Sequence, residues 1–213
     1  MLNKKMKTIN IHRIRELMGL HPLKIRNIYV FGSRVYGTNR EDSDYDILVT
    51  ACQMHAHLEI KDDEYNIHIY TPDNFKEKLK QHDIHALECV FAPEWAKLQL
   101  KEDYLNQWKY NPEKLQKYIH NQSYSSWGKG KDNIVEGYTE YGLKSIFHSL
   151  RMLMFAIQIA NEGKIINYSE ANDLHKELMA LKDEDIEWNV FRDKYLPFKI
   201  YLEKQLKTIT NQE

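Results

Sequence analysis

The sequence of 213 residues contains only two cysteines, Cys52 and Cys89. Two cysteines cannot form a disulfide framework, and these two do not have the spacing of metal ligands. We therefore expect both to be small, buried apolar residues. No apolar run approaches the length of a membrane span, and the basic first residues lack the apolar core of a signal peptide. The sequence thus predicts a cytoplasmic protein without a membrane partner.

An excess of charge of either sign is also missing. The chain has 30 lysines and arginines against 31 aspartates and glutamates, which gives a formal net charge of −1. A contact with a polyanion such as a nucleic acid must therefore be local, because the whole molecule provides no attractive field. Hydrophobic residues make up 42% and charged residues 29% of the chain, as in other globular proteins that bury a core. The length allows one large domain or two small ones.

The expected secondary structure changes at about residue 100. Before that point, alternating apolar residues predict strands at 27–31 and 45–51 and a hairpin of 57–60 with 65–70. Helical spacing predicts helices at 11–20, 72–81 and 85–95. Beyond residue 101, helices are expected at 112–122, 134–159, 169–181 and 183–209. We therefore predict an α+β fold, in which residues 1–100 form a mixed β-sheet flanked by helices and residues 101–213 form an all-helical domain.

The segment 29–49, YVFGSRVYGTNREDSDYDILV, is the most informative about function. Successive side chains of a strand point to opposite faces, so Asp44 and Asp46 are expected on one side of the second strand. Two neighbouring carboxylates repel each other, and a divalent cation relieves the repulsion. Mg²⁺ prefers oxygen ligands and also bridges to phosphate oxygens. The turn at Gly32 and Ser33 offers backbone N–H groups and a hydroxyl to a phosphate chain, so the pattern indicates a nucleotidyl-transfer site.

This segment resembles the signature of the nucleotidyltransferase superfamily that includes DNA polymerase β, which reads Gly-Ser, a spacer and Asp-x-Asp. Its core, GSRVYGTNREDSDYDI, is similar to stand-alone bacterial and phage nucleotidyltransferases, and the likeness continues through IYTPDNFKEKL, ALECVFAP and KSIFHSLRMLM. The resemblance implies a nucleotidyltransferase-type sheet and an enzyme that uses Mg²⁺ or Mn²⁺. Such an enzyme moves a nucleoside monophosphate from an NTP to an acceptor hydroxyl and releases pyrophosphate. Asp44 and Asp46 would be catalytic metal ligands, and Gly32 and Ser33 would bind the nucleotide.

The third acid of this superfamily comes from a later strand, and the position aligned with it here is Asn66. An amide oxygen is a weaker ligand than a carboxylate and cannot take up a proton near neutral pH. His68, on the same face, could act as the catalytic base instead, and so could Glu64 or Glu59. The other alternative is a catalytically impaired protein that still binds nucleotide and metal. Glu88 in ALECVFAP also matches a family position, and both a catalytic and a helix-capping role are open for it.

Several basic side chains are expected to bind the nucleotide. Arg34 follows the Gly-Ser turn and could contact a triphosphate, although it could also be a solvated loop arginine. Lys144, His148 and Arg151 share one face of a predicted helix. The resemblance favours contacts from these three residues to phosphate or base, against a surface stripe paired with Glu140 or Glu136.

The donor motif does not specify the acceptor. An RNA 3′ end, for instance of tRNA, a protein hydroxyl and a small molecule such as an aminoglycoside all fit the same donor site. A stretch rich in lysine and aromatic residues favours RNA slightly, because such residues hold single strands by charge and stacking. An amphipathic helix with aromatic core contacts is the other interpretation of that stretch. Its members are Trp108, Lys109, Tyr110, Lys114, Lys117, Tyr118, Tyr124, Trp127, Lys129 and Lys131.

Overall fold

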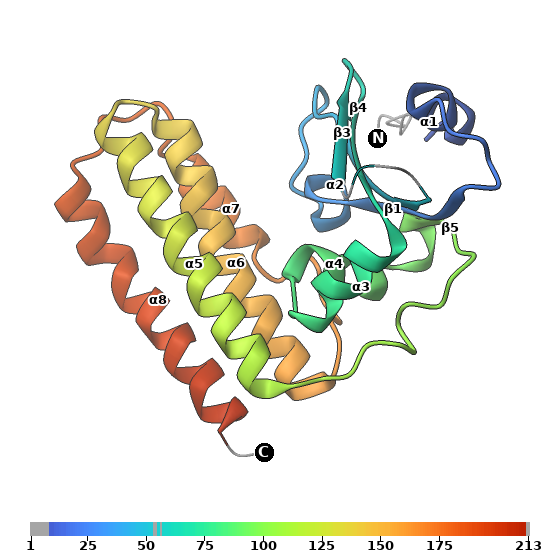
Figure 1. Ribbon diagram of the computed structural model, residues 1–213. Coiled ribbons are helices and arrows are strands. Elements are labelled where there is room, and N and C mark those ends of the chain that lie inside the picture. Colours follow the sequence, from blue (N-terminus) through green and yellow to red (C-terminus); the bar gives the residue numbers. More distant parts are fainter. Residues whose placement is uncertain (1–8, 53–54, 56, 212–213) are drawn as a thin grey trace, which may run out of the picture.

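The first half of the chain is built on a five-stranded sheet with the strand order β3-β4-β2-β1-β5 (Figure 1). The computed structural model describes residues 9–52, 55 and 57–211. Strands β2 and β4 run parallel, and the other neighbouring pairs are antiparallel, so the sheet is mixed. The strands are β1 (Ile25–Phe31), β2 (Tyr45–Ala51), β3 (His57–Lys61), β4 (Tyr65–Tyr70) and β5 (Lys97–Gln99).

Four of the helices begin where the sequence supplies a side-chain cap. Asn10, Thr71, Asp83 and Asn111 each accept a hydrogen bond from at least one backbone N–H in the first turn of the helix that follows. The helices are α1 (Ile11–Met18), α2 (Ser33–Tyr36), α3 (Pro72–Lys80), α4 (Ile84–Phe91), α5 (Pro112–Val135), α6 (Thr139–Glu162), α7 (Asn172–Met179) and α8 (Trp188–Thr210), with a 3₁₀ turn at Glu94–Ala96.

The two faces of the sheet pack against different parts of the chain. Ile47 and Val49 point to the face covered by α1, where they share a buried cluster with Ile14. Leu48, between them, belongs to a second cluster that includes residues of α4 and of the C-terminal helices. Because side chains alternate along a strand, Asp46 lies on the same face as Leu48. The polar positions of β2 therefore face the helical part of the molecule.

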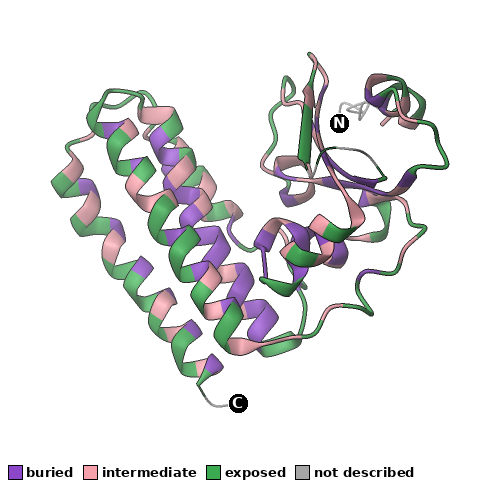
Figure 2. Cartoon of the chain, viewed as in Figure 1, coloured by how far each residue is buried: buried purple, intermediate pink, exposed green. Residues whose placement is uncertain are grey.

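Helices α5 to α8 pack side by side, with buried residues along their inner faces (Figure 2). Helices α5 and α6 approach closely at two glycines. A Cβ on Gly130 would lie 2.6 Å from a side-chain atom of Ile146, and a Cβ on Gly142 would lie 2.5 Å from one of Ile134. Larger residues would separate the two helices. Within the described ranges, none of the helices combines the length and the apolar character needed to cross a membrane.

The predicted fold class is confirmed, since a mixed sheet with helices precedes a region of helices α5–α8. Helix α5 continues to Val135, past the predicted end at residue 122, and Gly130 lies inside it at the contact with α6. The short strand β5 was not expected. Cys89 is buried, but the prediction is wrong for Cys52, which directly follows the end of β2 and is exposed. The domain boundary near residue 100 stays a prediction, and the basic residues 1–8 lie outside the described ranges.

Candidate active site

The turn between β1 and α2 places Gly32 directly against the second strand. Gly32 has φ +77°, and a Cβ there would lie 2.2 Å from Oδ2 of Asp46. Both the left-handed backbone and this contact require glycine at the position. Ser33 follows as the first residue of α2. The predicted phosphate-binding turn and one of the predicted metal ligands are thus in direct contact.

Asp44 and Asp46 have different surroundings. Asp46 lies in β2, opposite Phe31 of β1 and Asn66 of β4. Burial, and then the charge of Asp44, raises the pKa of Asp46 from its usual 3.8 to about 6. The side chain of Asp44 is 34% exposed, and its Oδ2 lies 3.6 Å from Nζ of Lys61. This lysine of β3 was not expected near the acids, because the contact depends on the pairing of strands.

Asn66 and His68 lie on β4, on the face that carries the acids. Asn66 Nδ2 is 3.4 Å from Oδ1 of Asp46 and 3.2 Å from Nε2 of His68. Asn66 Oδ1 is buried and has no hydrogen-bond partner among the described residues. His68 Nδ1 lies 3.4 Å from Nε2 of His57, and Glu59 is the strand neighbour of His68 in β3. Burial lowers the pKa of His68, which leaves a neutral imidazole able to accept a proton.

Two cavities meet at the Gly-Ser turn. The inner cavity, of about 370 Å³, is lined by Asp46 and His68 among others. The outer cavity, of about 800 Å³, is lined by Asp44 and Lys144 among others. Residues common to both linings form a shared wall, which consists of Ser33, Tyr36, His148 and Arg151. The two acids thus border different spaces on either side of this wall.

Arg34 lines neither of these two cavities. Its Nε donates to the carbonyl oxygen of Asp44 at 3.2 Å, and its Nη2 donates to the carbonyl oxygen of Ser43. The guanidinium carbon lies 3.8 Å from the centre of the Tyr45 ring. The side chain therefore fixes the backbone that leads into β2.

The structure divides the three predicted residues of α6. Lys144 borders the outer cavity, with Nζ 2.6 Å from Oε1 of Glu140. Arg151 is only 6% exposed, donates to Nδ1 of His148 at 2.9 Å and lies 3.7 Å from the centre of the Tyr36 ring. Burial, together with the charge of Arg151, lowers the pKa of His148 well below its usual value. Lys144 is therefore accessible, whereas Arg151 and His148 form part of the wall.

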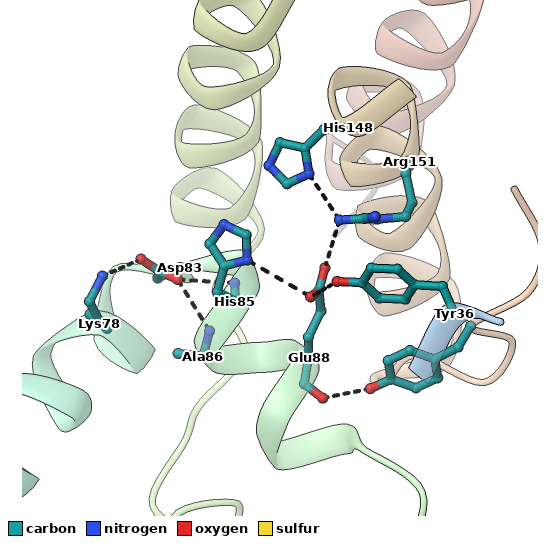
Figure 3. A network of polar contacts seen from close by, with 9 residues as sticks. Tyr36, Lys78, Asp83, His85, Ala86, Glu88, His148 and Arg151 are labelled. Carbon is teal, nitrogen blue, oxygen red and sulfur yellow. Dashed lines mark hydrogen bonds and ion pairs between the residues drawn. The ribbon is translucent and has the colours of Figure 1, made fainter. Parts of the chain in front are cut away.

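Glu88 of α4 lies at the centre of a buried polar network (Figure 3). The Tyr36 hydroxyl donates to Oε2, Arg151 Nη2 lies 3.8 Å from Oε1, and His85 Nδ1 lies 3.9 Å from Oε2. The Tyr168 hydroxyl donates to the backbone carbonyl of Glu88 at 2.7 Å. Burial alone would raise the pKa of Glu88, but His85 and Arg151 outweigh it and lower that pKa. The carboxylate thus connects α2, α4 and α6 next to the phosphate-binding turn.

Tyr36 and His85 were not expected in the site. The His85 ring stacks on that of His148, with ring centres 5.4 Å apart, and both histidines border the inner cavity. Their only signal in the sequence is proximity to motifs, since Tyr36 follows Gly-Ser and His85 precedes ALECVFAP. In the described part of the chain, no three His, Cys, Asp or Glu side chains converge on a point that could hold a metal ion. The candidate ligands are therefore two carboxylates and the amide oxygen of Asn66.

The Gly-Ser turn and both acids lie in a region of the chain that matches a known protein family. A family model described as nucleotidyltransferase domain matches residues 12–126, which is more than half of the 213 residues. Among solved structures, a nucleotidyltransferase-like protein from Exiguobacterium sibiricum 255-15 is similar at 11% sequence identity and a TM-score of 0.33. The match covers 94% of this chain and 73% of that one. A comparison with curated proteins finds no match.

Proposed function

The chain belongs to the nucleotidyltransferase domain family, and we propose that it transfers a nucleoside monophosphate from a nucleoside triphosphate to an acceptor hydroxyl. The observation that best supports this is the pair of cavities that meet at Ser33, with Asp44 bordering one and Asp46 bordering the other. Such a layout suits a reaction in which two substrates approach one phosphorus atom from opposite sides. The donor would occupy the outer cavity and the acceptor the inner one.

The residues at the junction fit a divalent cation, Mg²⁺ or Mn²⁺. The pKa of Asp46, at about 6, reflects a buried carboxylate beside a second one, an arrangement that a cation stabilises. In the free protein Nδ2 of Asn66 faces Asp46 and His68, and rotation of the amide would turn its buried Oδ1, which has no hydrogen-bond partner among the described residues, toward the ion. Asp44 and Asp46 would hold the ion, and Asn66 would complete the set. When bound, the ion would supply neutralisation of the charge that develops on the phosphoryl oxygens.

The outer cavity could take a triphosphate because its lining carries several cations, some of which are paired with acids of the same lining in the free protein. Lys144 and Lys182 line it together with Arg40 and Lys61. Ser33 would donate its hydroxyl and backbone N–H to the β- and γ-phosphates. Of the residues that the sequence predicted for phosphate binding, Lys144 keeps that role in our proposal. Arg34 would act indirectly, since it holds the backbone next to Asp44, and His148 and Arg151 would shape the wall.

His68 is the proposed base on the acceptor side. The acceptor oxygen would attack the α-phosphorus, the bond from that phosphorus to the bridging oxygen would break, and pyrophosphate would leave with the electron pair. The proton of the acceptor hydroxyl would pass to Nε2 of His68, where Asn66 Nδ2 lies at 3.2 Å in the free protein. A neutral imidazole suits this task, and burial keeps the pKa of His68 low.

Asn66 also favours a second candidate function, a nucleotide-binding protein that does not catalyse transfer. In that case the amide replaces the carboxylate that would otherwise act in the reaction. The acceptor class that we favour is RNA, with a protein hydroxyl and a small molecule as alternatives.

A labelling experiment separates these possibilities. The protein is incubated with each NTP, radiolabelled at the α-phosphate, together with Mg²⁺ or Mn²⁺ and total RNA. Transfer by the wild type would place label on RNA or on protein, which identifies the acceptor class. This label should disappear in Asp46→Asn and persist in the control Asp185→Asn, which changes an exposed aspartate. No transfer by the wild type, with metal-dependent nucleotide binding still measurable, would contradict the transferase and favour the binding protein.

A further inference from the structure

A third cavity, of about 490 Å³, lies between α3 and the start of α5. We call it the α3–α5 pocket. It adjoins the inner cavity, because His82 lines the pocket and the next residue, Asp83, lines the inner cavity. Both residues are buried, so the chain between α3 and α4 forms the wall between the two spaces. The pocket is bordered by Lys76, Lys80, Trp108, Lys109, Tyr110 and Lys114.

The lining of the α3–α5 pocket is strongly basic. It includes four lysines and no aspartate or glutamate. The two lysines of α3 each have a glutamate oxygen at 3.7 Å. Lys109 and Lys114 are exposed, and neither forms an ion pair with any residue of the described ranges. These two ammonium groups are therefore available to an anion from outside the chain.

An aromatic surface lies beside these charges. The ring of Trp108 is surrounded by three other rings. The distance between ring centres is 5.4 Å to His82, 6.2 Å to Tyr110 and 5.4 Å to Phe91. His82 Nε2 accepts from the backbone N–H of Asn111 at 2.9 Å, which fixes the ring. Burial, and then the charge of a nearby lysine, lowers the pKa of His82, so this ring stays neutral. The tryptophan Nε1 is buried without a hydrogen-bond partner among the described residues.

We propose that the α3–α5 pocket binds the backbone of a single-stranded nucleic acid whose 3′ end enters the inner cavity. Lysines that contact phosphates, beside aromatic rings on which bases stack, are the means by which proteins hold single strands without reading sequence. An acidic peptide would match the charge but would make no use of the aromatic surface. The adjoining position of the two cavities suits successive nucleotides of one strand. This inference rests on the proposed function, of which it specifies the acceptor.

Four members of the lysine-rich and aromatic stretch of the sequence, Trp108, Lys109, Tyr110 and Lys114, border the pocket, so the nucleic-acid interpretation applies to them. Tyr118 and Trp127 pack against the main buried cluster, as the alternative of an amphipathic helix predicts. The half-buried rings of Trp108 and Tyr110 pack against the same cluster and also line the pocket.

Binding of a fluorescently labelled, single-stranded oligoribonucleotide of about 12 nucleotides, within the usual site sizes, tests the proposal. Fluorescence anisotropy would be measured over a range of salt concentrations for the wild type and for the Lys109→Ala/Lys114→Ala variant. Both substitutions remove exposed side chains. The matched control is Lys204→Ala/Lys207→Ala, which removes the same charge from exposed positions of α8.

Loss of two phosphate contacts is expected to weaken binding roughly tenfold at low salt and to reduce the slope of log K against log salt by about 1.4. The control should bind like the wild type. Equal binding by wild type and pocket variant would overturn the proposal. Binding of free AMP at the pocket, without binding of the oligonucleotide, would overturn it as well, because the pocket would then serve a mononucleotide.

The same measurement distinguishes this inference from the proposed function. In an Asp46→Asn background, binding of the oligonucleotide should keep its dependence on Lys109 and Lys114, because the aspartate is not part of the pocket. If no transfer occurs under any condition but binding still depends on Lys109 and Lys114, the nucleic-acid site stands and the transferase fails. If transfer to a protein or small molecule occurs and the pocket variant binds RNA unchanged, the transferase stands and the nucleic-acid site fails.

Discussion

Replacement of Glu88 by Gln is expected to destabilise the protein by about 3 kcal/mol, the lower end of the cost of breaking a buried ion pair. The side chain is 1% exposed and faces Arg151, which is 6% exposed. Removal of the negative charge leaves the guanidinium buried beside a neutral amide. Gln keeps the size of the side chain and an oxygen that accepts from the Tyr36 hydroxyl. For this reason we expect a cost at the lower end of the range for a broken buried ion pair. A loss of this size is a large share of the stability of an ordinary domain.

Urea unfolding monitored by circular dichroism would measure the effect. The exposed substitution Glu184→Gln is the control for the same chemical change and should cost little. The double variant Glu88→Gln/Arg151→Met should recover about 2 kcal/mol of the loss, because it removes the unpaired cation as well. A loss below about 1 kcal/mol for Glu88→Gln, or no recovery in the double variant, would refute the argument that this charge pair stabilises the fold.

The pH dependence gives an independent check of the same reasoning. The pKa of Glu88 is lower in the folded chain than its usual 4.5, since His85 and Arg151 outweigh the effect of burial. A carboxyl group of this kind contributes stability above its unfolded pKa and loses that contribution as the pH falls through the folded pKa. The difference between wild type and Glu88→Gln should therefore be full near pH 7 and should shrink below about pH 4.5. A difference that grows in acid would contradict the assignment.

Three further predictions concern the candidate active site. Gly32→Ala should abolish transfer and should lower the free energy of unfolding, measured in urea, more than Gly163→Ala does. Both glycines have positive φ, but only at Gly32 would the new Cβ contact Asp46. The pKa of Asp46 is raised to about 6, so the wild type loses stability as the pH rises from about 4 to about 6 and this carboxyl group ionises. In EDTA, Asp46→Asn should remove this loss. The variant should therefore be more stable than the wild type by roughly 3 kcal/mol at most at pH 8, and hardly more stable near pH 4. His68→Ala should lower kcat for label transfer about a hundredfold with little change in KM for the NTP, and an unchanged kcat would place the base elsewhere.

Those parts of the site that depend on short-range pattern could be predicted from the sequence. The period of two along the strand beginning at Tyr45 placed Asp46 on the face opposite Ile47, and the same alternation grouped Asn66 with His68. The structure pairs Asp46 with Asn66 across β2 and β4, as expected for two strands that carry one site. Caps such as Thr71 and Asp83 likewise act within a few residues of their position.

Contacts between distant residues could not be predicted in this way. Tyr36 and Glu88 are separated by 52 positions, and their hydrogen bond requires α2 to lie next to α4. The partnership of Lys61 with Asp44 depends on the pairing of β3 with β4, and strand β5 exists only because β1 offers it an edge. Gly130 lies between the helices that the sequence predicts, but in the fold it is part of α5 and allows the close contact with α6. In each case tertiary structure overrides a local preference.

The contacts of the basic side chains around the candidate site follow the chemistry of arginine and lysine. Arg34 and Arg151 have rigid, planar guanidinium groups, and they are fixed on backbone carbonyls and on Glu88. Lys61 and Lys144, which have flexible stems, line the outer cavity and are paired with Asp44 and with Glu140, respectively. In the proposed reaction, a metal ion would take over Asp44 and a triphosphate would take over the two lysines. Substrate binding would then exchange one set of ion pairs for another, so the charges of the donor would enter a site whose own charges are already balanced.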